Sequence, residues 1–170
     1  VQGKESMEIP YLSEKWMSML GHVQSEAKRL GMQVDMNGGT GWPFGGPTIS
    51  PEYAATKQIV QTYDLNADTK SLDLRVKDAK QQGLAYLQAL VFVSKDGRRE
   101  QWSVEKVQDG FLPLSRSVEG KLYALYVGKT RQKVKRSAPG GEGYVMNHLS
   151  KESLMHYLKR FDKAFAEYGT

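Results

Sequence analysis

Apolar side chains recur at helical intervals between residues 13 and 30, on one face of a predicted amphipathic helix. They are Trp16, Leu20, Val23, Ala27 and Leu30. Ser13 can cap the first turn, and Gly31 is placed to end the helix. A short strand is predicted directly afterwards, at 32–37, so residues 1–56 are interpreted as the first α/β units of a barrel or open sheet.

The pattern changes in the middle of the chain, where apolar and polar residues alternate over short stretches. Residues 72–76 show this alternation, and Asp96-Gly97 is a hairpin signal between two apolar runs, 91–93 and 101–104. Several short strands separated by turn residues favour an antiparallel sheet or small sandwich. We therefore expect residues 57–132 to form an antiparallel β insertion.

A returning α/β unit is expected at 133–170, with a strand near 134–137 and a terminal helix capped by Ser150. The helix carries a regular apolar stripe of Leu154, Tyr157, Leu158, Phe161, Ala164, Phe165 and Tyr168. Such a stripe is typical of a core face rather than a cofactor site. A further helix is expected from Ser50, with Pro51 at its first position, although β-branched residues at 58–63 favour a strand.

Length and charge limit these possibilities. The chain has 170 residues, whereas a complete (β/α)8 barrel needs about 250. It has no cysteine, which excludes disulfides and thiolate chemistry, and no apolar stretch of membrane-spanning length. It begins at Val1 without a signal peptide or initiator Met, as expected of a fragment.

The net charge of +5 equals the number of basic residues between 129 and 136, which we interpret as a solvated strand face. A basic nucleic-acid binder is the alternative.

The most distinctive segment is 38–47, with five glycines, two prolines, Trp42 and Phe44. Aromatic rings can cover the C–H faces of a sugar, while the side chains of Asp35 and Asn37, expected on one strand face, can bind its hydroxyls. The alternatives are an ordered structural loop for 38–47 and a buried capping carboxylate for Asp35.

A second glycine-rich segment, 139–143, contains one carboxylate, Glu142, with little steric cover. It can approach a ligand or metal, or it can be a loop charge satisfied by backbone N–H groups. Asn147 and His148 follow at an expected strand end before the terminal helix, and His148 alone is more often structural than catalytic. The histidines show no zinc spacing, and no Asp-x-Asp-x-Asp-Gly calcium loop is present.

Residues 26–37, 38–47 and 135–143 together resemble glycoside hydrolase family 106, the bacterial α-L-rhamnosidases that act on plant polysaccharides. The resemblance implies part of a TIM-type (β/α)8 barrel from a much longer, secreted or periplasmic enzyme. It also implies inverting hydrolysis with two glutamates and a calcium ion. Those glutamates are expected beyond Thr170, so the isolated chain should be inactive.

Within this resemblance Glu142 is assigned to substrate or calcium binding before catalysis. The candidate substrate-binding residues are Asp35, Asn37, Trp42, Phe44, Glu142, Asn147 and His148. The loops 38–47 and 139–143 are expected to follow successive barrel strands and to meet on one rim. The alternative function is a non-catalytic carbohydrate-binding or structural module.

Overall fold

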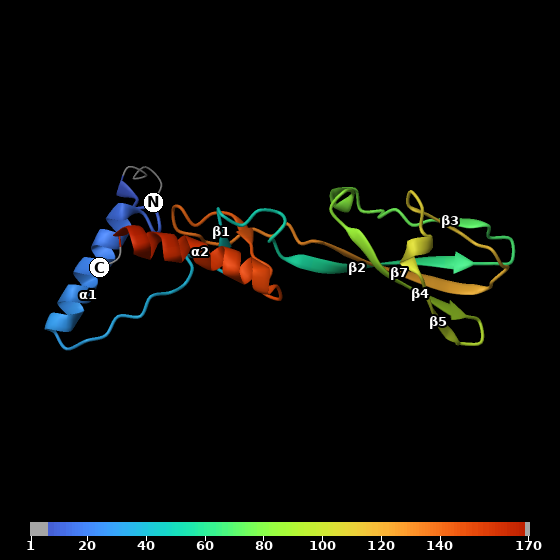
Figure 1. Cartoon of the computed structure of the whole chain (residues 1–170), viewed down its shortest axis with the longest axis horizontal. Coiled ribbons are helices and arrows are strands. Elements are labelled where there is room, and N and C mark those ends of the chain that lie inside the picture. The colour runs from blue at the N-terminus through green and yellow to red at the C-terminus, as the bar shows by residue number, and fades with distance from the viewer. Residues whose placement is uncertain (1–6, 169–170) are drawn as a thin grey trace. The chain divides into compact units, whose positions relative to one another are not determined.

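The computed structural model describes residues 7–168, an α+β chain that divides into two compact units (Figure 1). Unit 1 comprises the residues up to 55 and those from 130 onward, and unit 2 comprises 56–129. Unit 1 contains α1 (Glu14–Arg29), β1 (Gly45–Gly46), β8 (Tyr144–Val145) and α2 (Lys151–Tyr168). Unit 2 contains β2 (Thr56–Leu65), β3 (Ser71–Asp73), η2 (Ala79–Gln81), β4 (Tyr86–Ser94), β5 (Arg99–Trp102), η3 (Val104–Lys106), β6 (Phe111–Pro113) and β7 (Gly120–Lys129).

Unit 2 is built from antiparallel strands, as the alternating pattern predicted. Its main sheet has the order β2-β7-β4-β5, and β3 pairs with β6 in a second, two-stranded sheet. The longest ladder joins β2 to β7, from Thr56 opposite Lys129 to Leu65 opposite Gly120. The predicted Asp96-Gly97 turn connects β4 to β5, and Gly97 adopts a positive φ of 84° that favours glycine.

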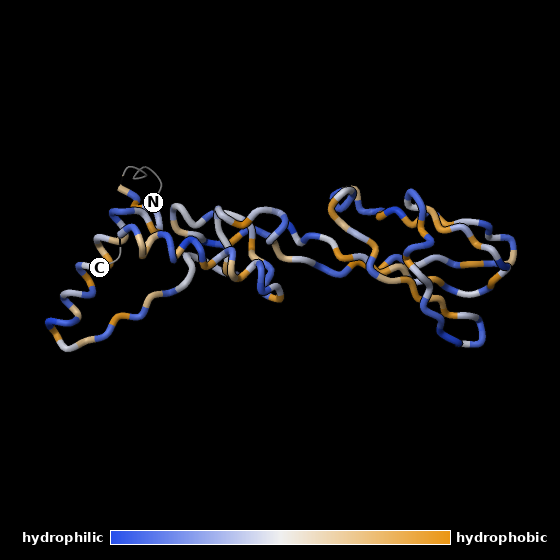
Figure 2. Tube along the Cα trace, in the orientation of Figure 1, coloured by the Kyte–Doolittle hydropathy of each residue, from blue (hydrophilic) through white to orange (hydrophobic). Residues whose placement is uncertain are grey.

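The alternating apolar residues of unit 2 form its core, and Figure 2 shows this alternation along the strands. Leu90, Leu122 and Ala124 are fully buried. The rest of the core consists of Leu65, Leu72, Leu74, Val76, Phe92, Leu112 and Tyr126. Each buried leucine or phenylalanine contributes about 1.5–3 kcal/mol relative to an exposed position, so this core accounts for the association of the two sheets.

The two helices of unit 1 begin where the capping residues predicted. The Ser13 hydroxyl accepts a hydrogen bond from Trp16 N at 3.3 Å, and the Ser150 hydroxyl accepts one from Ser153 N at 3.1 Å. Part of the predicted stripe of α2 is buried, at Tyr157 and Ala164. Ala164 belongs to one small core of unit 1 and Tyr157 to another, and the partly buried Phe161 of α2 packs against both.

Three predicted elements are wrong. Residues 32–37 form no regular strand and pair with none among residues 7–168, and Met32 and Val34 are exposed instead of packing on a sheet. The segment from Ser50 makes only a turn, with Tyr53 N bonded to Ser50 O, before β2 begins. The segment near 134–137 contributes isolated bridges, not a strand.

The barrel expectation is corrected by the same observations. Every strand pair within the described residues 7–168 is antiparallel, and no barrel closure is seen there. A (β/α)8 barrel requires parallel neighbours. The described chain is therefore α+β, with two helices and antiparallel sheets.

Candidate functional site

The two glycine-rich loops of unit 1 lie side by side. Lys135 N donates to Trp42 O at 3.0 Å, and Trp42 N donates to Lys135 O at 3.2 Å. Further along, Gly45 pairs with Val145 and Gly46 with Tyr144 in the short β1–β8 ladder. The loops therefore meet, as the sequence predicted, but through antiparallel pairing and not on the rim of parallel barrel strands.

Glycine is required where the loops approach each other most closely. A Cβ atom on Gly41 would overlap the carbonyl oxygen of Lys135, and one on Gly141 would overlap the side chain of Thr40. Gly143 faces the carbonyl of Gly46 in the same way. The glycines of both segments thus permit backbone-to-backbone packing that any side chain would prevent.

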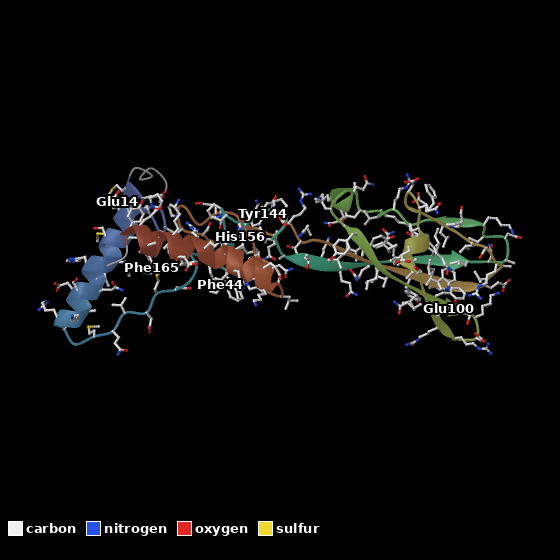
Figure 3. All side chains as sticks on the ribbon, viewed as in Figure 1. Glu14, Phe44, Glu100, Tyr144, His156 and Phe165 are labelled. Atoms are coloured by element: carbon white, nitrogen blue, oxygen red, sulfur yellow. The ribbon has the colours of Figure 1, made fainter. Side chains whose placement is uncertain are left out.

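Trp42 stands on this paired backbone with its side chain 70% exposed. Its ring meets Phe44 edge to face, with centroids 6.1 Å apart, and Phe44 in turn stacks on Tyr157 of α2 at 6.5 Å. Phe44 and the helix that supports it are shown in Figure 3. The partly buried Phe44 and the buried Tyr157 thus support an indole that presents most of its surface to solvent, which is the arrangement of an aromatic platform for a ligand.

Arg160 of α2 ties the second loop to the N-terminal segment. Its guanidinium donates to the carbonyl oxygens of Gly140 and Tyr11, and it lies 5.3 Å from the centre of the Tyr11 ring. Burial lowers the pKa of Arg160, while the nearby Tyr157, Tyr11 and Glu142 oppose that shift. Glu142 itself is exposed, so its carboxylate is open to solvent and close enough to act on Arg160 electrostatically.

Sequence reasoning missed Arg160. Its signal was a cation inside the apolar stripe of α2, three residues after Tyr157 and directly before Phe161. A charge at such a position is stable only if it is hydrogen-bonded. The carbonyl groups of the glycine-rich loop provide that partner, so the loop and the helix position each other.

The remaining predicted residues are placed less favourably. Asp35 and Asn37 are exposed on the unpaired segment 32–37, so the shared strand face and the buried capping role for Asp35 are both wrong. The amide oxygen of Asn147 accepts a hydrogen bond from Leu149 N at 3.1 Å, and His148 is exposed. Among the described residues, no hydrogen bond or ring contact joins Asp35, Asn147 or His148 to Trp42.

His156 and the basic segment have structural contacts. The His156 ring stacks on Tyr53 at 4.1 Å, and its Nε2 is 2.9 Å from Thr48 O. The Lys133 ammonium lies 3.3 Å from the centre of the Tyr144 ring, and Figure 3 labels both Tyr144 and His156. Val134, in the middle of the basic segment, is buried while Lys133 and Lys135 are exposed. The side chains therefore alternate here although no regular strand forms.

Residues 7–168 contain no group of three His, Cys, Asp or Glu side chains arranged to hold a metal ion. Neither helix in that part of the chain is long and apolar enough to cross a membrane. A calcium ion remains an expectation from the resemblance, with Glu142 the one carboxylate on the two paired loops.

Comparison with known proteins relates the chain to a glycoside hydrolase over a short stretch. It is 45% identical over 47 residues to a protein of Formosa agariphila named "Putative beta-glucuronidase". The matched stretch covers 27% of this chain but 4% of that much longer protein. No family model and no solved structure matches the chain. The similarity is therefore partial, and it concerns glycoside hydrolases in general.

Proposed function

We propose that this chain is part of a glycoside hydrolase, and that the paired loops of unit 1 hold one sugar ring of its substrate. The observation that carries the proposal is Trp42, an exposed indole whose backbone pairs with Lys135, on the segment that leads to Glu142. An aromatic face and a carboxylate suit the C–H faces and the hydroxyl groups of a sugar. The partial similarity to the Formosa agariphila protein supports the same class of enzyme.

The finer proposal is an α-L-rhamnosidase acting on rhamnose-containing plant glycans. Its support is the resemblance of the two glycine-rich loops to family 106, and these are the loops that pack together. Inverting hydrolysis needs two carboxylates about 6.5–9.5 Å apart, and the two loops supply only Glu142. The catalytic pair and any calcium ion are therefore assigned to other parts of a longer, secreted or periplasmic bacterial protein.

A non-catalytic sugar-binding module is the second candidate. The presence of only one carboxylate, Glu142, on the two loops favours it. A binding site needs an aromatic platform and hydrogen-bonding groups, all of which unit 1 can supply. A hydrolase needs a second carboxylate that the paired loops lack. The two candidates share the Trp42 site and differ only in whether a longer chain completes it.

Hydrolysis of chromogenic aryl glycosides tests the proposal. A longer protein that includes this chain is assayed on aryl α-L-rhamnoside, aryl β-D-glucuronide and aryl β-D-glucoside. We expect turnover of the rhamnoside, no activity of the isolated 170-residue chain, and at least tenfold lower kcat/KM for Trp42→Ala, because an aromatic platform is lost. The matched control is Leu149→Ala, which removes another exposed apolar side chain, 97% accessible, from the same unit.

The outcomes are distinct. Turnover of the glucuronide alone would support the proposal of a glycoside hydrolase and contradict the finer proposal of a rhamnosidase. If none of the three substrates is hydrolysed but a sugar still binds at Trp42, the chain belongs to a non-catalytic sugar-binding module. Equal kcat/KM values for Trp42→Ala and Leu149→Ala would show that the paired loops do not bind the substrate.

A further inference from the structure

We propose that a cavity in unit 2 binds a single anionic sugar ring, one that carries a carboxylate or a sulfate group. This site does not rest on the function proposed for unit 1. The cavity measures about 170 Å³ and lies between the β5–η3 segment and the chain that leads from β6 toward β7. A cavity of about 150 Å³ admits one six-membered ring such as benzene, so this one can take one face of a single sugar ring, whose substituents then lie outside against the exposed side chains of Glu100 and Lys106.

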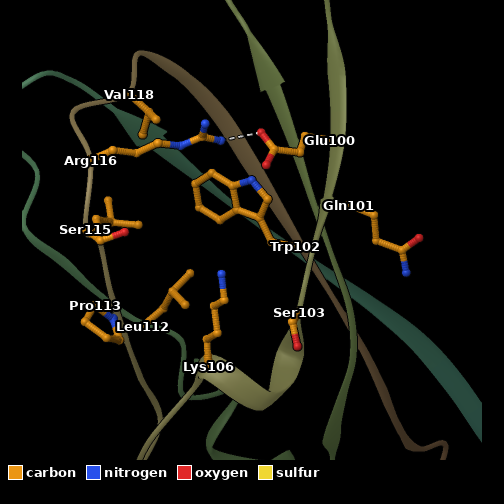
Figure 4. Close-up of a pocket in the computed structure, with 11 residues that line it drawn as sticks. Glu100, Gln101, Trp102, Ser103, Lys106, Leu112, Pro113, Ser115, Arg116 and Val118 are labelled. Atoms are coloured by element: carbon orange, nitrogen blue, oxygen red, sulfur yellow. Dashed lines mark hydrogen bonds and ion pairs between the residues drawn. The ribbon is translucent and has the colours of Figure 1, made fainter.

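Trp102 gives the cavity an aromatic wall. Phe92 stacks on the indole with centroids 4.9 Å apart, which fixes the ring and occupies one of its faces. The indole then lines the cavity with its remaining surface, opposite the apolar side chain of Leu112 (Figure 4). This is the shape that suits the C–H face of a sugar.

Charged groups surround the indole. Figure 4 shows Trp102 between Arg116 and Lys106, with the Lys106 side chain pointing into the cavity. Arg116 is paired with Glu100 at 2.5 Å, whereas Lys106 forms no ion pair within the part of the chain that the structure describes. The one carboxylate among the lining residues, that of Glu100, is already paired with Arg116, so the charge of Lys106 favours an anionic ligand.

The cavity also distinguishes a sugar from a nucleic acid. A phosphodiester backbone offers only hydrogen-bond acceptors, so it supplies no donor for the Glu100 carboxylate that lines the cavity. Sugar hydroxyls both donate and accept, so they match a lining that combines Glu100 and Arg116 with the hydroxyls of Ser103 and Ser115. The charge of Lys106 then pairs with the carboxylate or sulfate of the same ring.

The test is an NMR titration of the 170-residue chain with galacturonic acid hexamers. The three tryptophans, Trp16, Trp42 and Trp102, give separate indole N–H resonances, so a shift of Trp102 reports this cavity and a shift of Trp42 reports the unit 1 loops. We expect saturable shifts of Trp102 with Trp16 and Trp42 unchanged. A carboxyl-reduced hexamer of equal length, which has no charge, should bind at least tenfold more weakly. A sulfated oligosaccharide is titrated in the same way, and the tighter of the two anionic ligands shows whether the site prefers sulfate or carboxylate.

Lys106→Glu and Lys80→Glu form a matched pair. Both lysines are exposed residues of short 3₁₀ helices in unit 2, but only Lys106 lines the cavity. We expect Lys106→Glu to weaken binding about tenfold or more, and Lys80→Glu to leave it within about twofold, since only the first charge is at the ligand. Equal losses in both variants would mean non-specific attraction to a basic chain. The proposal would be overturned if the carboxyl-reduced hexamer bound as tightly as the galacturonic acid hexamer, or if single-stranded DNA bound more tightly than either. It would also be overturned if neither the galacturonic acid hexamer nor the sulfated oligosaccharide shifted the Trp102 resonance.

Discussion

The packing of the two glycine-rich loops predicts that Gly41→Ala destabilises unit 1. The new Cβ would overlap Lys135 O and lie 3.0 Å from Val134 Cγ1 and 3.1 Å from Ser137 N. Two of these three neighbours are backbone atoms, so relief requires the loops to separate. Their separation stretches or breaks the two Trp42–Lys135 hydrogen bonds.

The expected cost follows from these contacts. Overpacking typically costs 1–3 kcal/mol, and each lost hydrogen bond about 1 kcal/mol, so we expect a loss of about 3 kcal/mol. For a unit of this size that lowers Tm by roughly 10 °C or more. Gly38→Ala is the control from the same loop, because a Cβ there meets no atom within 4 Å. Its expected change is within about 1 kcal/mol.

The assay is thermal and urea unfolding followed through the indole resonances of Trp16 and Trp42, which report unit 1, with Trp102 reporting unit 2. Gly41→Ala should lower the unfolding midpoint of the first two probes and leave Trp102 unchanged. Equal midpoints for Gly41→Ala and Gly38→Ala would show that the loops do not pack as described and would refute the reasoning.

Two other predictions concern buried polar groups. The Gln81 side chain, 2% exposed, accepts a hydrogen bond from Lys129 N and donates one to Lys129 O, each at 2.9 Å. Gln81→Leu removes both bonds and should cost unit 2 about 2 kcal/mol in urea unfolding. Gln82→Leu, at an exposed neighbour, should change stability by under about 0.5 kcal/mol, and equal effects would contradict this account. Burial, with a smaller contribution from Tyr157, raises the pKa of Tyr11 to about 12 from 10.0. The unfolded state then loses this proton first, so unit 1 should lose stability as pH rises from 10 to 12. Unfolding midpoints across that range should fall less steeply for Tyr11→Phe, and identical slopes would contradict the assignment.

Local chemistry could be predicted from the sequence where a pattern depends on neighbouring residues. Ser13 and Ser150 cap the helices because a hydroxyl serves the free N–H groups of its own first turn. The Asp96-Gly97 hairpin follows in the same way, since the glycine allows the positive φ that the turn requires.

Pairing partners could not be predicted in this way. Residues 32–37 have strand-like alternation, but a strand needs a neighbour, and no segment between residues 7 and 168 supplies one. Proximity of the loops at 38–47 and 139–143 was predicted from a barrel, yet antiparallel bridges between Trp42 and Lys135 produce it. Arg160 was missed because its partners are backbone carbonyls, which leave no trace in the identity of the residues that carry them.

The central claim is that the paired loops of unit 1 hold a sugar ring against Trp42. A titration of the 170-residue chain with a rhamnose-containing oligosaccharide, followed at the indole N–H resonances, tests it directly. We predict a saturable shift of the Trp42 resonance, with Trp16 unchanged and the shift abolished in Gly41→Ala at a temperature where that variant is folded. A Trp42 resonance that stays fixed up to about 10 mM oligosaccharide, a concentration that half-saturates a site with a binding free energy of only about −2.7 kcal/mol, would contradict the claim.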